Sequence, residues 1–223
     1  MLAAASARHG LTMHRWDFVA AYLQGDLEDG EVIYCSQPPG YETLGADGRA
    51  RVCRVDKPIY GMAQSGRRWQ RGLFAWITSW SPRPGSPSPP TLRQSENDES
   101  VFHIRDTVET PSGPRDETLL LGVYVDDLAC CASHTDEYSL YHRFTTDMAS
   151  RWDVEDEGRI SGLLGIEITH DPAGYVTLCQ TAYIDRLVER FLPDGLPARL
   201  QHDSVPCGPD LPDLVEAALS STD

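Results

Sequence analysis

Two adjacent carboxylates interrupt the most apolar stretch of the sequence. Asp126 and Asp127 lie between apolar residues that run from Leu119 to Cys131. Carboxylates placed side by side between buried strands repel each other and resist ionisation unless a positive charge compensates them. A divalent metal ion is the usual compensation, so the pair is a candidate metal site. An ordinary hairpin turn is the alternative, because aspartate is common in turns.

The apolar runs that flank this pair are predicted to be strands, because they are short and rich in branched side chains. Strands are predicted at residues 118–125, 128–132, 163–169 and 175–179. Apolar residues at helical spacing predict helices at residues 64–80, 136–152 and 183–192, the last with Thr181 as its cap and Pro193 as its stop. Antiparallel strand pairs that alternate with helices indicate an α+β fold.

Five segments of the chain, taken in order, resemble the signature segments of one protein family. Residues 124–127 read YVDD, which resembles the Tyr-x-Asp-Asp box of reverse transcriptases. The other segments are similar to those of the Ty1/copia type of retrotransposon. They read WDFVAAYLQG from Trp16, QPPGY from Gln37, IYGMAQSGRRW from Ile59, and LGIEI from Leu164 followed by LCQTAYI from Leu178. The resemblance runs from about residue 1 to about residue 206.

The resemblance implies DNA synthesis on an RNA or DNA template by two-metal nucleotidyl transfer. Asp17, Asp126 and Asp127 would be the catalytic residues and the metal ligands. Asp17 and Asp126 would bridge the ions, and Asp127 would add charge nearby. Oxygen ligands favour Mg²⁺, with Mn²⁺ as a substitute. The expected partners are an RNA or DNA template with its primer and deoxynucleoside triphosphates.

The resemblance also assigns residues to the substrates. Those expected to contact the nucleotide or template are Tyr22, Tyr60, Gly61, Gln64, Arg67 and Tyr124. Tyr22 would lie against the sugar of the incoming nucleotide and reject a 2′-hydroxyl, although a core aromatic is the alternative. Gly61 would allow a close approach because it has no side chain. Gly165 and Ile166 would belong to the hairpin that supports the primer end, with an ordinary sheet edge as an equal alternative.

The sequence departs from the family pattern at two positions and at its start. Ala63 and Gly66 stand where the family commonly has lysine and proline, which would weaken phosphate contact and loosen the start of the next helix. The basic segment that precedes the first box in the family is not in the sequence. We therefore expect a palm-like antiparallel sheet with helices packed on one face, incomplete fingers and the start of a thumb. We also expect little primer extension by this chain alone.

One domain is predicted over residues 1–202. Residues 81–90 are rich in proline and serine and are predicted to be an insertion loop within it. Residues 203–223 hold several carboxylates and prolines but no lysine or arginine, which predicts a flexible acidic tail. If the chain is part of a longer product, other parts of a Pol polyprotein are its partners. Its oligomeric state is left open.

The charge of the chain excludes a protein that wraps nucleic acid with its whole surface. Nineteen Lys and Arg face 34 Asp and Glu, a net charge of −15. One stretch is basic, and we expect it to form a positive strip beside the site; it contains Arg49, Arg51, Arg54, Lys57, Arg67, Arg68 and Arg71. The six cysteines show no metal-binding spacing, and no secretory or membrane-spanning segment is found. We therefore expect an intracellular protein, in a cytoplasmic particle or the nucleus, that is neither secreted nor bound to a membrane.

Two other functions remain open. The first is a non-catalytic remnant of a degenerate retroelement that keeps a palm-like domain and binds nucleic acid weakly at most. The second is an unrelated metal-dependent hydrolase that uses the same carboxylates. The order of the five segments argues against the hydrolase.

Overall fold

A computed structural model of the chain describes residues 1–193. These residues belong to two units, which divide after Leu178. The acidic tail predicted over residues 203–223 lies outside the described residues, as do residues 194–202 of the predicted domain.

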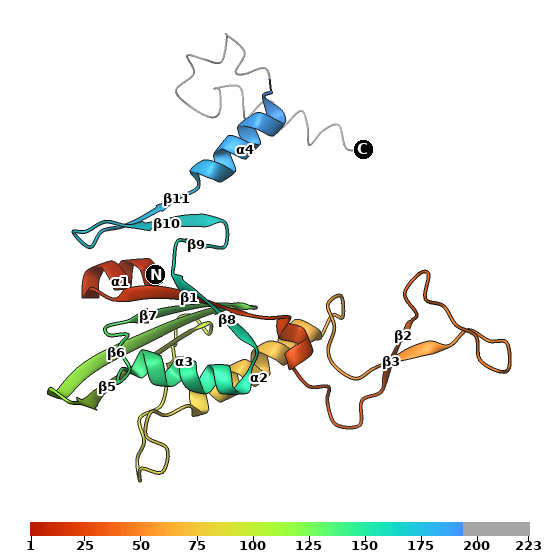
Figure 1. Cartoon of the computed structure of the whole chain (residues 1–223), viewed down its shortest axis with the longest axis horizontal. Helices are drawn as coiled ribbons and strands as arrows, with labels where there is room; N and C mark the ends of the chain where they lie inside the picture. Colours follow the sequence, from red (N-terminus) through yellow and green to blue (C-terminus); the bar gives the residue numbers. More distant parts are fainter. Residues whose placement is uncertain (194–223) are drawn as a thin grey trace, which may run out of the picture. The chain divides into compact units, whose positions relative to one another are not determined.

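A six-stranded antiparallel sheet forms the centre of the first unit (Figure 1). The order of its strands is β4-β5-β6-β7-β1-β8. Their bounds are β1 Thr12–Phe18, β4 Arg93–Gln94, β5 Val101–Thr110, β6 Gly113–Tyr124, β7 Asp127–Ala132 and β8 Val154–Arg159. The predicted strand pair on either side of Asp126 is present as β6 and β7. Helices combined with this sheet confirm the α+β class.

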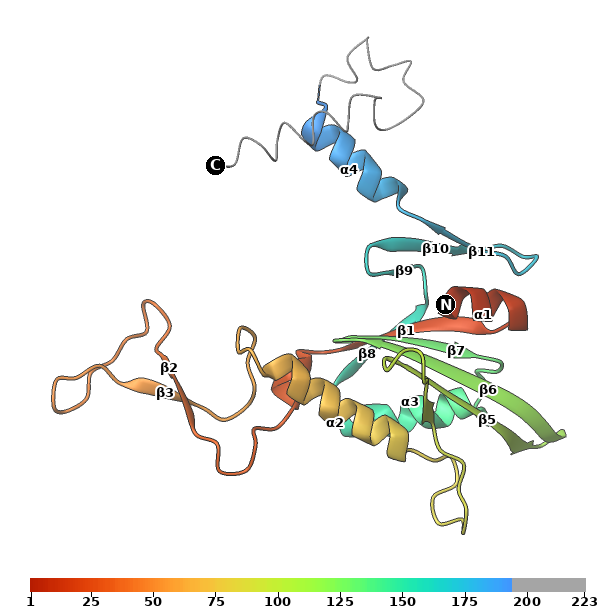
Figure 2. The same cartoon turned by 180° about the vertical axis from the view of Figure 1, so that it is seen from behind.

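Helices α2 (Ser65–Ser79) and α3 (Leu140–Arg151) cover one face of the sheet (Figure 2). They pack there because their apolar residues recur at helical spacing, which gives each helix one apolar face. In α2 this face is the buried stripe of Trp69, Leu73 and Ile77. These side chains pack against alternate residues of β6 and β7, which point to the same face. The largest core of the protein therefore lies between these helices and the two strands that flank Asp126.

Helix α1 (Leu2–His9) and a small sheet cover the opposite face. The small sheet has the order β11-β10-β9 and consists of β9 Gly162–Leu163, β10 Ile166–His170 and β11 Val176–Cys179. A second core, which includes Met13, Cys131 and Ile168, lies there. The prediction that the helices pack on one face therefore holds for α2 and α3 but not for α1. Leu2 of α1 occupies the space that a side chain at Gly122 would need, so glycine at this position lets α1 reach the sheet.

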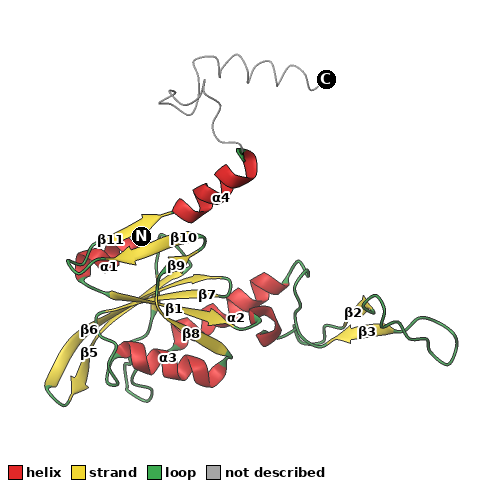
Figure 3. Cartoon of the chain, turned by 45° about the horizontal axis from the view of Figure 1, so that its top comes forward, coloured by secondary structure: helices red, strands yellow, loops and turns green. Residues whose placement is uncertain are grey.

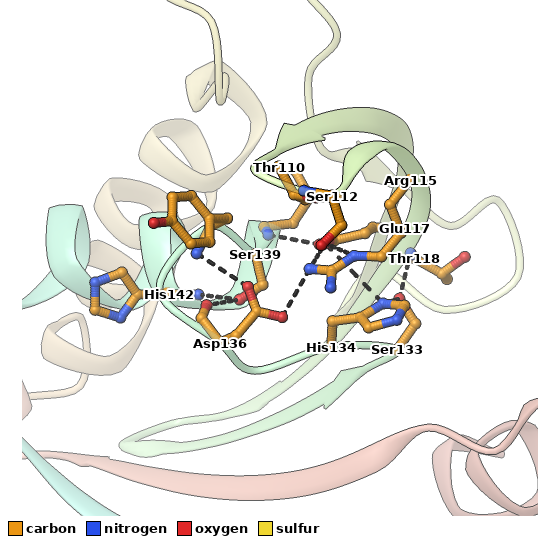
Figure 4. Close-up of polar contacts among 12 residues, drawn as sticks. Thr110, Ser112, Arg115, Glu117, Thr118, Ser133, His134, Asp136, Ser139 and His142 are labelled. Atoms are coloured by element: carbon orange, nitrogen blue, oxygen red, sulfur yellow. Dashed lines mark hydrogen bonds and ion pairs between the residues drawn. The ribbon is translucent and has the colours of Figure 1, made fainter.

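A buried carboxylate fixes the start of α3. The helix begins at Leu140 and not at Asp136, where the sequence predicted its start. The side chain of Glu117 on β6 is only 1% exposed and accepts hydrogen bonds from the backbone N–H of Leu140 and from Arg115 (Figure 4). Arg115 also pairs with Asp136 in the preceding turn, at 2.7 Å. Ser139 caps the helix by accepting from the backbone N–H of His142.

The predicted strand over residues 163–169 is instead two strands joined by a tight turn. Leu164 and Gly165 both adopt left-handed backbone conformations, and Leu163 pairs with Ile166 across the turn. The prediction missed this turn because the apolar residues on both sides read as one continuous strand.

A two-stranded hairpin of β2 (Ile33–Ser36) and β3 (Val52–Val55) forms a separate sheet of the first unit (Figure 3). It follows the short helix η1 (Ala21–Gln24). Residues 81–90 contain neither helix nor strand, as predicted. In the second unit, α4 (Thr181–Phe191) begins at Thr181, the residue predicted to be its cap, and Gln180 occupies the cap position instead. No helix within residues 1–193 is long and apolar enough to cross a membrane.

Candidate active site

Strand pairing brings Asp17 and Asp127 face to face. Asp17 on β1 lies directly opposite Asp127 on β7 in the antiparallel register. Directly opposed residues point to the same face of a sheet, with Cβ atoms about 4.5–5.5 Å apart. Asp126 lies directly before Asp127, in the two-residue turn between β6 and β7, where its carbonyl oxygen accepts a hydrogen bond from the backbone N–H of Phe18 at 2.9 Å. The three predicted catalytic aspartates are therefore gathered at one end of the central sheet.

A buried tryptophan stabilises the turn that carries Asp126. Trp69 of α2 donates a hydrogen bond from Nε1 to the carbonyl oxygen of Val125, at 2.6 Å. Val125 has a φ of 57°, a left-handed conformation that costs a β-branched residue about 1–3 kcal/mol. The indole of Trp69 packs edge to face on Phe18 with a centroid separation of 5.0 Å. The core therefore stabilises a turn that the local sequence disfavours.

Two of the three carboxylates have no ion-pair partner among residues 1–193. Burial raises the pKa of the Asp17 carboxyl, and the charges of Asp126 and Asp127 raise it further. Arg15 is two residues before Asp17 and pairs with Asp127, with Nη2 at 2.7 Å and Nε at 2.9 Å from Oδ1. Its other nitrogen pairs with Glu157 of β8 at 2.8 Å. Neither Asp17 nor Asp126 has an ion-pair partner among residues 1–193, whereas Asp127 does.

These residues fit a divalent cation in donor type and charge. Carboxylate oxygens are the ligands that Mg²⁺ prefers, and a cation between them would relieve the repulsion that raises the pKa of Asp17. In the described part of the chain, no three His, Cys, Asp or Glu side chains are already gathered closely enough to coordinate one ion. The Asp127 carboxylate is instead paired with the Arg15 guanidinium. The sequence analysis did not predict a role for Arg15. Its only signal is the alternation of side chains along β1, which places Arg15 on the same face as Asp17.

Two tyrosines lie beside the carboxylates. The rings of Tyr22 and Tyr60 are in contact, with centroids 4.5 Å apart. Partial burial raises the pKa of the Tyr60 phenol, and the charge of Asp126 raises it further. Tyr22 also explains glycine at position 66, because a Cβ there would lie 3.2 Å from the Tyr22 hydroxyl. The prediction for Gly66 considered only the start of α2 and missed this contact.

Three more of the predicted nucleotide contacts lie around the start of α2. Gly61 has a φ of 94° in the turn before the helix, a conformation that favours glycine. Gln64 occupies the N-cap position of α2, and Arg67 is exposed on its first turn. Among residues 1–193, Arg67 makes no ion pair, so its charge remains available.

The structure brings the predicted primer-supporting hairpin close to the carboxylates. A cavity of about 360 Å³ is lined by Tyr124 and Asp127 on one side and by Leu163, Leu164 and Ile166 on the other. Gly165 lies in the turn between β9 and β10, next to these lining residues. Tyr124 is 58% exposed at the end of β6. Ile166 of the predicted hairpin and Tyr124, a predicted nucleotide or template contact, therefore line the same cavity as Asp127.

The basic stretch of residues 49–71 is not the positive strip that the sequence predicted. Arg68 pairs with Glu31, and Lys57 pairs with Asp26 at 2.6 Å. Three more of its cations pair with nearby acids; these are Arg49 with Asp47, Arg54 with Asp56, and Arg71 with Glu28. The acidic partners within residues 26–31 precede the basic stretch in the sequence. The charge of residues 49–71 alone therefore does not include them. Arg51 and Arg67 are the two without an ion pair among the described residues.

Comparisons with known proteins give one family. A family model described as reverse transcriptase (RNA-dependent DNA polymerase) matches residues 1–81 and 107–196. The retrovirus-related Pol polyprotein from transposon TNT 1-94 of Nicotiana tabacum is 28% identical over 182 residues, which are 81% of this chain and 12% of that protein. The corresponding polyproteins from transposons RE1 and RE2 of Arabidopsis thaliana are each 29% identical, over 76% of this chain and 10% of theirs. No solved structure matches the chain.

Proposed function

Because the chain belongs to the reverse transcriptase (RNA-dependent DNA polymerase) family, we propose that Asp17, Asp126 and Asp127 are its catalytic site for DNA synthesis on an RNA or DNA template. The observation that supports this most is the register of β1 and β7, which sets Asp17 directly opposite Asp127 beside the turn of Asp126. In this proposal the central sheet with α2 and α3 is the palm of the polymerase.

Asp17 and Asp126 would hold Mg²⁺, or Mn²⁺ in its place. When bound, such ions activate the primer 3′-hydroxyl and stabilise charge on the triphosphate. The protein contributes the position of the carboxylates, fixed by the β1–β7 ladder and by the bond from Trp69 to Val125. Arg15 holds Asp127 by two contacts and leaves the unpaired charge on the other two aspartates.

The nucleotide would lie against the tyrosine pair and the start of α2. Tyr22 and Tyr60 present rings that contact each other at a tilt beside Asp17 and Asp126, which suits contact with the sugar of a deoxynucleoside triphosphate. Gly61 allows close approach to the backbone, while Gln64 and the unpaired Arg67 supply polar contacts. Gly165 and Ile166 would support the primer, since Ile166 lines the cavity that Asp127 also lines and Gly165 is its neighbour in the β9–β10 turn. Tyr124 lines the same cavity and would contact the nucleotide or template.

The chain spans about a tenth of the polyproteins to which it is similar. The activity of a complete reverse transcriptase, and assembly with other parts of a Pol polyprotein, are therefore part of the proposal. The family match does not favour a non-catalytic remnant. The presence of all three aspartates on one end of the sheet also argues for a working metal site.

A metal titration tests the site directly. Mn²⁺ added to the chain and followed by electron paramagnetic resonance should lose its free-ion signal as it binds. Asp126→Asn should weaken the binding of Mn²⁺ about tenfold or more, because it removes a charged ligand. Asp116→Asn is the matched control, since Asp116 is an exposed carboxylate near the other end of β6.

The same variants should separate in primer extension on a primed RNA template with Mg²⁺ or Mn²⁺. Any extension by the chain should fall to background in Asp126→Asn and stay unchanged in Asp116→Asn. A wild-type chain that leaves the Mn²⁺ signal unaltered would contradict the metal site, and undiminished extension by Asp126→Asn would contradict the catalytic assignment.

A further inference from the structure

Two cysteines lie directly opposite each other in the β2–β3 hairpin. The register of the antiparallel pair matches Cys35 with Cys53, and both thiols are free and half-buried. Opposed residues in such a pair have Cα atoms about 4.5 or 5.5 Å apart. Either separation falls in the range of roughly 4.4–6.8 Å that a disulfide spans.

The thiols share one face of the hairpin with apolar neighbours. Ile33, Cys35, Cys53 and Val55 alternate along the two strands on the less exposed side. The other four strand residues are exposed; they are Tyr34, Ser36, Val52 and Arg54. Both sulfurs therefore point to the same side, where they can meet without a change of backbone direction.

A glutamine side chain fixes the register that brings the thiols together. Gln37 donates from Nε2 to the carbonyl oxygens of Thr43, at 3.0 Å, and Arg51, at 2.8 Å. Its Oε1 accepts from the backbone N–H of Thr43 at 2.9 Å and from its hydroxyl at 2.8 Å. An isolated two-stranded hairpin is marginally stable in water, and its register can slip. Gln37 opposes that slip two residues beyond Cys35.

We propose that Cys35 and Cys53 form a reversible dithiol–disulfide pair, a modification site closed by oxidised glutathione or a comparable small disulfide. The thiolate of one cysteine attacks the small disulfide, forms a mixed disulfide and releases one glutathione thiol. The opposed cysteine then attacks this mixed disulfide, forms the Cys35–Cys53 bond and releases the second thiol. The protein loses two protons and two electrons, and the glutathione disulfide gains them. A reducing thiol reverses both steps.

Closing the bond would join the two strands covalently. The hairpin then keeps its register without depending on Gln37, because the cross-link removes open conformations. Disulfides of intracellular proteins are usually transient and sense the redox state. The inference rests on the hairpin alone and holds whether or not the aspartates catalyse DNA synthesis.

The test is oxidation of the folded, reduced chain with oxidised glutathione, followed by alkylation of free thiols, trypsin digestion without reductant and mass spectrometry. Trypsin cleaves after Arg49, Arg51 and Arg54, so the two cysteines fall on different peptides. We expect these peptides to be joined in the wild type and to separate on reduction. The buried Cys130 and Cys131 serve as internal controls that the chain stays folded, since burial raises the pKa of Cys131 to about 12.

Single variants separate the two steps. Cys35→Ser should accumulate a glutathione adduct on Cys53, and Cys53→Ser should accumulate one on Cys35. Such adducts should be at least about tenfold less abundant in the wild type, because the second thiol is held at high effective concentration. Gln37→Ala should slow closure. Separate stable adducts on both wild-type cysteines, or single variants that form no adduct, would overturn the proposal.

Discussion

The strand pairs β6–β7 and β2–β3 are both antiparallel hairpins, but they are stabilised in opposite ways. The first lies in the middle of the central sheet, with α2 packed beneath it and Trp69 bonded to its turn. The second is a sheet of two strands whose fixed points are polar, namely Gln37 at the loop and the pair of Lys57 with Asp26 beyond β3. Packing against the apolar core therefore stabilises the β6–β7 hairpin, whereas exposed hydrogen bonds and an ion pair stabilise the β2–β3 hairpin.

The difference shows where each kind of stabilisation is useful. Carboxylates that must share an ion need positions fixed within fractions of an ångström, and a close-packed core gives that. Exposed polar contacts contribute little each and are weakened by salt. The β2–β3 hairpin is therefore free to change its order without disturbing the aspartates. Three substitutions test this contrast.

The largest effect is expected from Trp69→Ala. The indole is 3% exposed and packs on Phe18 and Trp152. Its removal should lower the free energy of unfolding by about 3–5 kcal/mol in urea denaturation. Tyr34→Ala on β2 is the matched control, since Tyr34 is 59% exposed, and it should change stability by less than about 0.5 kcal/mol. Equal losses for the two variants would remove the contrast between the hairpins.

A smaller effect of opposite sign is expected from Asp17→Asn in the presence of a chelator. The folded-state pKa of Asp17 is raised, so the folded chain takes up a proton there more readily than the unfolded chain. The charged carboxylate therefore destabilises the fold above this pKa, and the cost disappears as the pH falls below the ordinary carboxyl value. Asp17→Asn should be more stable than the wild type at neutral pH, by a margin that shrinks in acid.

Added Mg²⁺ should reduce this margin, because binding to the wild type stabilises its folded state. Thermal unfolding with and without Mg²⁺ at several pH values measures both effects, and Asp116→Asn should show neither. A variant less stable than the wild type at neutral pH would mean that the aspartate makes favourable contacts that outweigh the repulsion.

The smallest global effect is expected from Gln37→Ala. Its hydrogen bonds are exposed, so the free energy of unfolding should change by no more than about 0.5 kcal/mol. The amides of β2 and β3 should nevertheless exchange with deuterium faster, while those of β6 and β7 keep their protection. Slower exchange in all four strands, or faster exchange in β6 and β7, would show that the hairpins are coupled.

Sequence patterns predicted what depends on periodicity and missed what depends on contacts across the chain. The apolar spacing of Trp69, Leu73 and Ile77 gave α2, and the apolar runs beside Asp126 gave β6 and β7. The resemblance gave Asp17, although nothing near it in the sequence says that it faces Asp127. That fact follows from a register between distant strands.

The misses have the same cause. Arg15 reads as one cation in a mixed segment until β7 brings Asp127 to it, and Glu117 reads as a surface residue until α3 starts on it. The basic stretch looked nearly unopposed because three of its acidic partners, those of Lys57, Arg68 and Arg71, precede it by many residues. Charge counted along a window does not measure charge in space.

The pairing of Arg15 with Asp127 joins residues 112 positions apart. A ribosome synthesises the strand with Asp17 early and the strand with Asp127 much later, and β1 enters the sheet between β7 and β8. Until the later strands emerge, β1 has no neighbour on either side within that sheet, and its edges are open to pairing with other chains. Assembly of the aspartate site thus marks the moment in biosynthesis at which the first edge of this aggregation-prone strand becomes protected, and the second edge is covered when β8 follows.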